Sequence, residues 1–228
     1  MEILGLEKLS MVDYGDLCCA VVFTGGCNFK CPFCHNSSLV EGDVQPLDTQ
    51  DVFDYLVKRK GFLDGVVVSG GEPTIHSDLP DFIKSLKDIG YKVKLDTNGT
   101  NYEMLKKLVD NGLVDFVAMD IKNSPALYPE TCGVKGLMLT NIEKSINLLK
   151  SGVVDYEFRT TLVKQFHIPQ SVEEIGKLVS GAKIIYLQKF VDNGTTILDG
   201  LTEVDKTTAL QFKTILEKYV QNVSLRGY

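Results

Sequence analysis

Three cysteines lie close together near the start of the chain, in the pattern Cys27-x-x-x-Cys31-x-x-Cys34. Thiolates are the usual protein ligands of iron–sulfur clusters, so a loop with three of them can bind three irons of a [4Fe–4S] cluster. A structural cluster of this kind normally has a fourth cysteine, and here the fourth iron would be open to a substrate. The remaining cysteines lie outside this pattern: Cys18, Cys19 and Cys132.

Three other uses of these cysteines are open. The segment Cys31-Pro-Phe-Cys34-His35 fits the attachment pattern of c-type haem, which leaves Cys27 unused and implies export. A structural zinc site could take the three cysteines and His35, although His35, directly beside Cys34, is poorly placed to complete a tetrahedron. A thioredoxin-like pair of Cys31 and Cys34 would again leave Cys27 without a role. The spacing favours the iron–sulfur cluster over all three.

Apolar, β-branched runs that alternate with amphipathic helical patterns must position this loop. Several runs are apolar on both sides, which is expected where helices cover both faces of a parallel sheet. We predict an α/β fold of six strand–helix units, each of roughly 30 residues. It would be a partial (β/α)6 barrel formed as one domain by residues 18–228, with residues 1–17 packing on it. The predicted strands are Cys18–Thr24, Gly65–Ser69, Tyr91–Thr97, Val114–Ile121, Asp155–Val163 and Lys183–Phe190.

Composition excludes several classes of function. The 228 residues carry 24 Lys+Arg and 30 Asp+Glu, a formal net charge of −6 at pH 7, and 44% are hydrophobic. This supports a folded core and argues against nucleic acid as the partner. No run of about 18 apolar residues is present, so the sequence predicts no membrane span. The first residues lack the features of a signal peptide, and we therefore expect a cytoplasmic protein with reduced cysteines.

Polar residues follow the predicted strands one after another. In parallel α/β folds, chemistry takes place at the carboxyl ends of the strands. Six strands that each carry polar groups at the same end are difficult to explain by packing alone. After the cysteine loop, these groups are Gly70-Gly71-Glu72, Asp96-Thr97-Asn98-Gly99, Asp120 with Lys122, Arg159 and Gln188.

Residues 25–36 read Gly-Gly-Cys-Asn-Phe-Lys-Cys-Pro-Phe-Cys-His-Asn, which resembles the signature loop of the radical S-adenosylmethionine (SAM) superfamily. The Cys-His-Asn ending is similar to that of glycyl-radical-enzyme activases, above all the activating proteins of anaerobic ribonucleoside-triphosphate reductase. The segment from Leu9 to Tyr14 extends the resemblance. That family usually continues Asp13-Tyr14 with Pro-Gly, whereas this chain has Gly15-Asp16.

The resemblance implies an enzyme with two cofactors, a [4Fe–4S] cluster held by the three loop cysteines and SAM bound at the open iron. It also implies a partial (β/α)6 barrel of the radical SAM type. The reaction of such enzymes is reductive cleavage of SAM, which produces a 5′-deoxyadenosyl radical. In an activase this radical takes a hydrogen atom from a glycine of a larger glycyl radical enzyme, here anaerobic ribonucleotide reductase. Reduced flavodoxin or ferredoxin would be the electron donor.

The resemblance assigns SAM contacts to the strand ends. The segment Gly70–Glu72 is similar to the family's motif for the methionine amino group, where a carboxylate accepts hydrogen bonds from an ammonium. Asp96, Thr97 and Asp120 could share a monovalent cation beside the methionine carboxylate, because two aspartates near an anion would otherwise repel it.

Other contacts follow in the same way. Phe33 stands where the family places an aromatic ring against adenine, although a core role is the ordinary alternative for a phenylalanine. Lys122 and Arg159 would balance carboxylate charge. Asn98 is either a SAM contact or part of a simple turn, and Gln188 would contact the ribose or the adenine.

Three alternatives to this activase remain open. One is the activase of a pyruvate formate-lyase-type enzyme, and another is a radical SAM enzyme that acts on a small molecule, similar to 7-carboxy-7-deazaguanine synthase. The third is a non-catalytic zinc- or iron-binding module. Neither His76 nor His167 enters these hypotheses, and we expect both to be loop or helix-start residues that are mostly exposed to solvent.

Overall fold

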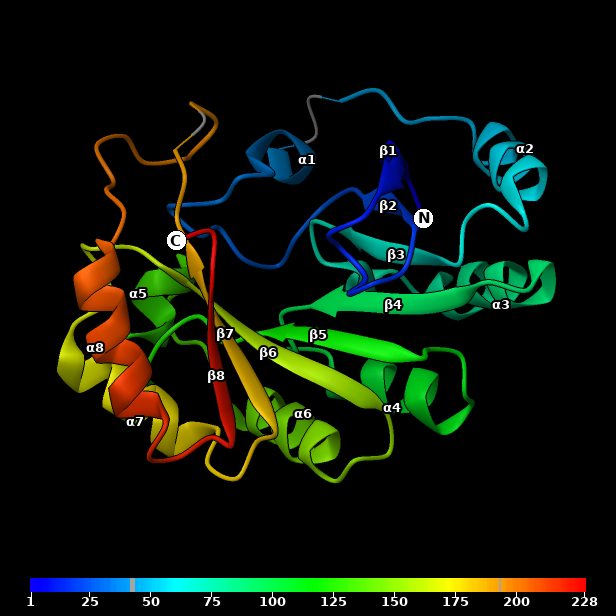
Figure 1. Ribbon diagram of the computed structural model, residues 1–228. Coiled ribbons are helices and arrows are strands. Elements are labelled where there is room, and N and C mark those ends of the chain that lie inside the picture. Colours follow the sequence, from blue (N-terminus) through cyan, green and yellow to red (C-terminus); the bar gives the residue numbers. More distant parts are fainter. Residues whose placement is uncertain (42–43, 193) are drawn as a thin grey trace. The chain divides into compact units, whose positions relative to one another are not determined.

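The computed structural model describes residues 1–41, 44–192 and 194–228 (Figure 1). The chain forms two compact units. The first contains Met1–Asn28, Ser38–Thr97 and Asn101–Ala118, and the second contains Phe29–Ser37, Asn98–Thr100 and Met119–Tyr228. Strand β5 (Phe116–Asp120) contributes residues to both units, so each unit is described separately.

The first unit is built on strands β1 (Ile3–Ser10), β2 (Cys19–Thr24), β3 (Gly65–Gly70) and β4 (Lys92–Thr97). Strand β1 pairs with β2 antiparallel, and β2, β3 and β4 are parallel. The valines of β3 are buried on both sides of the strand, as expected for a sheet covered on both faces. The helical segments are α2 (Thr49–Arg59), η1 (Pro73–Ile75), α3 (Leu79–Ile89) and α4 (Tyr102–Asp110), and the short α1 (Ser37–Glu41) begins at the boundary of the units.

The second unit contains the end of β5 and strands β6 (Asp155–Leu162), β7 (Ile184–Lys189) and β8 (Asn222–Arg226). Strand β7 pairs in parallel with both β6 and β8, and Figure 1 shows these three strands side by side. Helices α7 and α8 pack against each other. The helices of this unit are α5 (Tyr128–Cys132), α6 (Thr140–Lys150), α7 (Pro169–Leu178) and α8 (Lys206–Leu216).

The predicted α/β fold is confirmed, because strands alternate with helices and the six predicted strands correspond to β2 through β7. Strand order follows the chain within each unit, from β1 to β4 in the first and from β6 to β8 in the second. Two strands were missed by the sequence prediction, the antiparallel β1 and the last strand, β8. Within the described ranges, no helix is long and apolar enough to cross a membrane.

Candidate active site

The start of the cysteine loop rests directly on the Gly70–Glu72 turn in the first unit. Gly70 has a φ of 119°, a conformation that side chains disfavour. A Cβ on Gly71 would lie 1.7 Å from the carbonyl oxygen of Gly26, so only glycine allows this approach. The Glu72 N–H donates to the same carbonyl oxygen at 2.8 Å. The turn therefore fixes the residue immediately before Cys27.

The Glu72 carboxylate is buried, with 1% of the residue exposed. Its Oε1 accepts hydrogen bonds from the Thr74 N–H at 3.1 Å and the Thr74 Oγ1 at 2.5 Å. It also accepts one from the Thr97 Oγ1 at 2.7 Å. These bonds join the ends of β3 and β4 and hold the carboxylate in one orientation, the arrangement that a fixed acceptor for an ammonium group requires.

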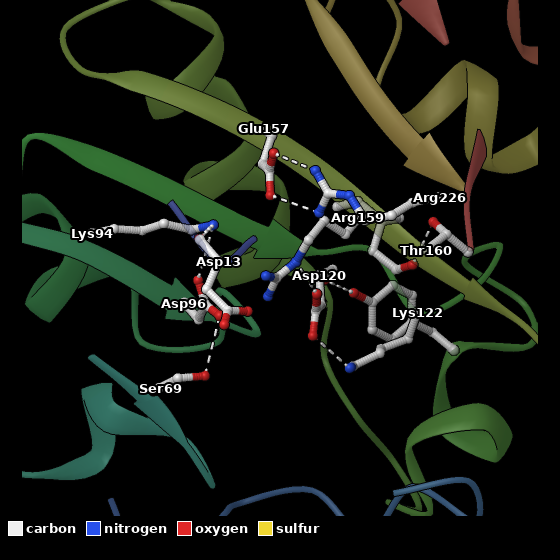
Figure 2. Close-up of polar contacts among 12 residues, drawn as sticks. Asp13, Ser69, Lys94, Asp96, Asp120, Lys122, Glu157, Arg159, Thr160 and Arg226 are labelled. Atoms are coloured by element: carbon white, nitrogen blue, oxygen red, sulfur yellow. Dashed lines mark hydrogen bonds and ion pairs between the residues drawn. The ribbon is translucent and has the colours of Figure 1, made fainter. Parts of the chain in front are cut away.

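Asp96 lies at the end of β4, in contact with two polar side chains of its own unit (Figure 2). The Ser69 Oγ donates to its Oδ2 at 3.1 Å. The Lys94 Nζ lies 3.8 Å from its Oδ1 and donates to the Asp13 carbonyl oxygen at 2.6 Å. Sequence reasoning did not select Lys94, although the alternation of β4 places it on the same face as Asp96.

The second unit holds the later part of the cysteine loop against helix α5. The Lys30 N–H donates to the Cys132 carbonyl oxygen at 2.8 Å, and the Cys34 N–H donates to the Cys31 carbonyl oxygen at 3.0 Å. A hydrogen bond from the Cys132 thiol and the positive charge of Lys122 lower the pKa of Cys31 to about 7, against the opposing effect of burial. This environment favours the thiolate, the form that binds metal.

The chemistry of these residues fits an iron–sulfur cluster. The six cysteines, which all lie in the described ranges, form no disulfide. Cys27 belongs to the first unit, and Cys31 and Cys34 belong to the second. In the described part of the chain, no three Cys, His, Asp or Glu side chains are grouped to hold a metal ion. That criterion applies to ligands that meet at one metal ion. The cysteines of a [4Fe–4S] cluster each bind a different iron, so their sulfur atoms lie farther apart than the ligands of a single ion.

Two aromatic contacts surround the end of the loop in the second unit. The buried Phe33 ring lies 5.8 Å from the Phe166 ring in a tilted arrangement. The His35 ring stacks on Phe190 at 5.6 Å. Contact with adenine stays a prediction for Phe33, whose observed role is packing. His35 therefore packs on an aromatic ring of its own unit.

Asp120 forms ion pairs with two basic side chains in the second unit (Figure 2). The Lys122 Nζ donates to its Oδ2 at 2.8 Å, and the Arg159 Nε donates to its Oδ1 at 2.9 Å. Burial opposes ionisation of Asp120, but the charges of Arg159 and Lys122 outweigh it and lower the pKa of the carboxyl group to about 2. Asp120 in turn raises the pKa of Lys122 against the effect of burial. All three groups are therefore charged at neutral pH.

The expectation that His167 is exposed is wrong. Only 3% of this residue is exposed, and burial lowers the pKa of its ring. Its Nε2 lies 3.0 Å from the Lys122 carbonyl oxygen. Its Nδ1 lies 3.1 Å from the backbone nitrogen of Val163 and 3.1 Å from the carbonyl oxygen of the same residue. His167 therefore fixes the backbone of Lys122. His76 is half-buried, with its Nε2 2.8 Å from the Gly25 carbonyl oxygen.

Two further predicted contact residues lie in the second unit. The Asn98 Oδ1 accepts hydrogen bonds from the Thr100 N–H at 3.0 Å and the Thr100 Oγ1 at 2.7 Å, which is the local bonding of a simple turn. Gln188 pairs in register with Thr161 on β6 and with Arg226 on β8. The register therefore places Arg226, which the sequence analysis did not select, beside Gln188. The Arg226 guanidinium also lies 3.9 Å from the centre of the Tyr186 ring.

The predicted residues are thus placed at the strand ends within each unit. The first unit joins Glu72 to Thr97, and Asp96 to Ser69. The second joins Asp120 to Lys122 and Arg159. The predicted cation ligands are divided, with Asp96 and Thr97 in the first unit and Asp120 in the second, so a shared cation stays a prediction.

The fold is α/β, and the loop carries three cysteines with the spacing typical of an iron–sulfur cluster motif. The chain matches the Radical SAM superfamily over residues 21–167, which is more than half of its length, and it belongs to that superfamily. It is therefore an enzyme whose cofactors are a [4Fe–4S] cluster and SAM. The family assignment agrees with the resemblance carried by the cysteine loop.

This chain is similar to one relative over nearly all of its length and to another over about half of it. It is 34% identical over 231 residues, 97% of this chain and 94% of the relative, to a protein of Methanocaldococcus jannaschii named as a candidate glycyl-radical enzyme activating enzyme. A pyruvate formate-lyase-activating enzyme of Listeria monocytogenes is 35% identical over 138 residues, which is 53% of this chain and 54% of that enzyme.

Two solved structures show the same fold. Streptococcus suis SuiB bound to the precursor peptide SuiA matches with a TM-score of 0.71 and 15% identity, over 91% of this chain and 48% of SuiB. A domain of pyruvate-formate lyase-activating enzyme from Bacteroides vulgatus matches with a TM-score of 0.57 and 20% identity, over 72% of this chain and 99% of that chain. The predicted fold of the radical SAM type is confirmed by these matches.

Proposed function

We propose that this chain activates a glycyl radical enzyme by removing a hydrogen atom from one of its glycines. The observation that carries the proposal is the end-to-end match to a relative of that name, over 97% of this chain. When bound, the cluster and SAM supply the 5′-deoxyadenosyl radical that takes the hydrogen atom. The protein binds and orients SAM and excludes water.

The contacts within each unit support specific roles in SAM binding. The Glu72 carboxylate, held by Thr74 and Thr97, would accept hydrogen bonds from the methionine ammonium group. Lys122 and Arg159 carry one more positive charge than Asp120 neutralises, so this group would attract the methionine carboxylate. Cys31, whose lowered pKa favours the thiolate, would be a cluster ligand together with Cys27 and Cys34.

We further propose anaerobic ribonucleotide reductase as the partner. The Cys-His-Asn ending of the loop, at residues 34–36, supports this choice. A specific observation favours a second candidate, because the Listeria pyruvate formate-lyase-activating enzyme matches half of this chain at 35% identity. The alternative partner is therefore a pyruvate formate-lyase-type enzyme.

Electron paramagnetic resonance (EPR) tests both partners directly. Anaerobically reconstituted protein, reduced with flavodoxin, ferredoxin or dithionite, is incubated with SAM and one candidate partner. We expect a glycyl doublet on the partner and faster release of 5′-deoxyadenosine than without it. The matched control is the same partner with its radical-site glycine changed to alanine, which should give no doublet. Rapid turnover of a small molecule, with no doublet on either partner, would contradict the activase function.

A further inference from the structure

Lys94 is a buried lysine on the same face of β4 as Asp96. Only 4% of the residue is exposed, which is unusual for a lysine unless its charge is compensated. Its Nζ lies 3.8 Å from the Asp96 Oδ1, and Figure 2 shows the side chain extending between Asp96 and the backbone of Asp13. All three residues belong to the first unit.

Two further contacts hold this ammonium group in place without removing its charge. The Asp13 carbonyl oxygen accepts a hydrogen bond from it at 2.6 Å. The Phe116 ring lies 5.5 Å away and presents a cation–π contact. The Asp13 carboxylate itself accepts a hydrogen bond from the Ser10 Oγ at 2.5 Å. The ion pair with Asp96 places the positive charge of Lys94 at the end of β4.

We propose that Lys94 is a positioning residue that supplies the positive charge next to Asp96, so that SAM binds without a monovalent cation. This inference rests on the proposed function and on the resemblance to the family, which implies that the methionine carboxylate lies beside Asp96. An aspartate and a carboxylate repel each other unless a positive charge compensates them. In the second unit, Asp120 likewise has its own partners, Lys122 and Arg159. Both aspartates thus take their compensating charge from the protein.

The first experiment uses the wild-type enzyme with its cluster. SAM binding is titrated calorimetrically in sodium, potassium or lithium chloride and, at equal ionic strength, in tetramethylammonium chloride, whose cation is too large for such a site. We expect dissociation constants that agree within about twofold. A saturable tightening of tenfold or more by one small cation would overturn the inference. An absence of SAM binding in every salt would instead overturn the proposed function on which it rests.

The second experiment uses Lys94→Met, with Lys92→Met as the matched control because Lys92 is an exposed lysine of the same strand. In tetramethylammonium chloride, Lys94→Met should bind SAM at least about tenfold more weakly than Lys92→Met. Sodium or potassium should restore part of that loss, because a small cation can replace the missing ammonium group.

A purely structural role for Lys94 would give a different result. Iron content and the melting temperature show whether Lys94→Met is folded and carries its cluster. A folded variant that binds SAM as tightly as Lys92→Met, or whose loss no cation reverses, would contradict the positioning role. If the variant does not fold, the wild-type titrations alone decide the question.

Discussion

Replacement of Asp120 by Asn should destabilise the protein in a manner that depends on pH. The Asp120 carboxyl has its pKa lowered from 3.8 to about 2, a difference of about 1.8 units, and each unit corresponds to about 1.4 kcal/mol. The folded state therefore gains about 2 kcal/mol from this carboxylate at neutral pH. A carboxyl whose pKa is lowered on folding stabilises the protein above its unfolded-state pKa, and this contribution is lost as the pH falls from about 4 towards 2.

The measurement is urea unfolding of the cluster-free protein under anaerobic conditions. The free energy of unfolding of Asp120→Asn should be lower than that of the wild type by about 2 kcal/mol between pH 5 and pH 7. This difference should shrink below about pH 4, where the Asp120 carboxyl of the unfolded wild-type protein begins to be protonated while that of the folded protein stays ionised. This loss is the attraction of Lys122 and Arg159 for the Asp120 carboxylate, which the neutral Asn side chain does not provide.

The control is Asp110→Asn, which removes an exposed ion pair with Lys106 on helix α4. Exposed pairs contribute about 0–1 kcal/mol, so this variant should unfold almost as the wild type does. Equal stability of Asp120→Asn and Asp110→Asn at pH 7 would refute the reasoning. So would a difference between Asp120→Asn and the wild type that stays constant down to pH 3.

Three further predictions concern the cysteines and Glu72. Replacing any one of the three loop cysteines with Ala should abolish the reconstituted cluster, as an iron assay would show. The Cys132→Ala variant should retain about four irons per chain. Loss of iron from Cys132→Ala would show that Cys132 is a cluster ligand. Glu72→Ala should weaken SAM binding by about 1–3 kcal/mol in calorimetry. The control is Glu72→Gln, which loses the negative charge but can still accept a hydrogen bond from Thr97. Unchanged SAM affinity in both variants would exclude a contact between Glu72 and the methionine ammonium group. Burial raises the pKa of Cys19 to about 11, so iodoacetamide at pH 8 should modify this thiol only in unfolded protein. Peptide mass spectrometry can show where the label lies. Labelling of Cys19 in the native protein would contradict its buried environment.

Strands that are buried on both faces could be predicted, and strands at the ends of the chain could not. The run Val66-Val67-Val68 in β3 is apolar on both sides because both sides are covered. In β8 only Val223 is buried, and the alternation of Asn-Val-Ser-Leu-Arg has just two apolar residues, which is too short a pattern to identify a strand. Strand β1 contains Glu7 and Lys8 in an exposed stretch. Such strands are recognised by their partners rather than by their own residues.

The same limit applies to the candidate site. The turn at Gly70–Glu72 could be predicted because its residue types are required by local backbone geometry. Lys94 and His167 could not, because a polar group is buried only where distant residues satisfy it. The acceptor of Lys94 is Asp13, 81 residues away, and that of His167 is Lys122, 45 residues away. Pairings at these separations leave no periodic trace in the sequence.

The close approach of Gly71 to the Gly26 carbonyl oxygen restricts which sequences this enzyme can have. Every other amino acid has a Cβ, and at position 71 that atom would meet the oxygen at 1.7 Å, whatever the rest of the side chain. A library of all amino acids at this position, sorted for folded protein, should therefore return glycine alone. At Gly112, no described atom lies within 4 Å of an added Cβ, and residues such as Asn that tolerate its φ of 62° should also be recovered. Mutational tolerance would thus differ between two glycines of the same unit because of one backbone oxygen atom.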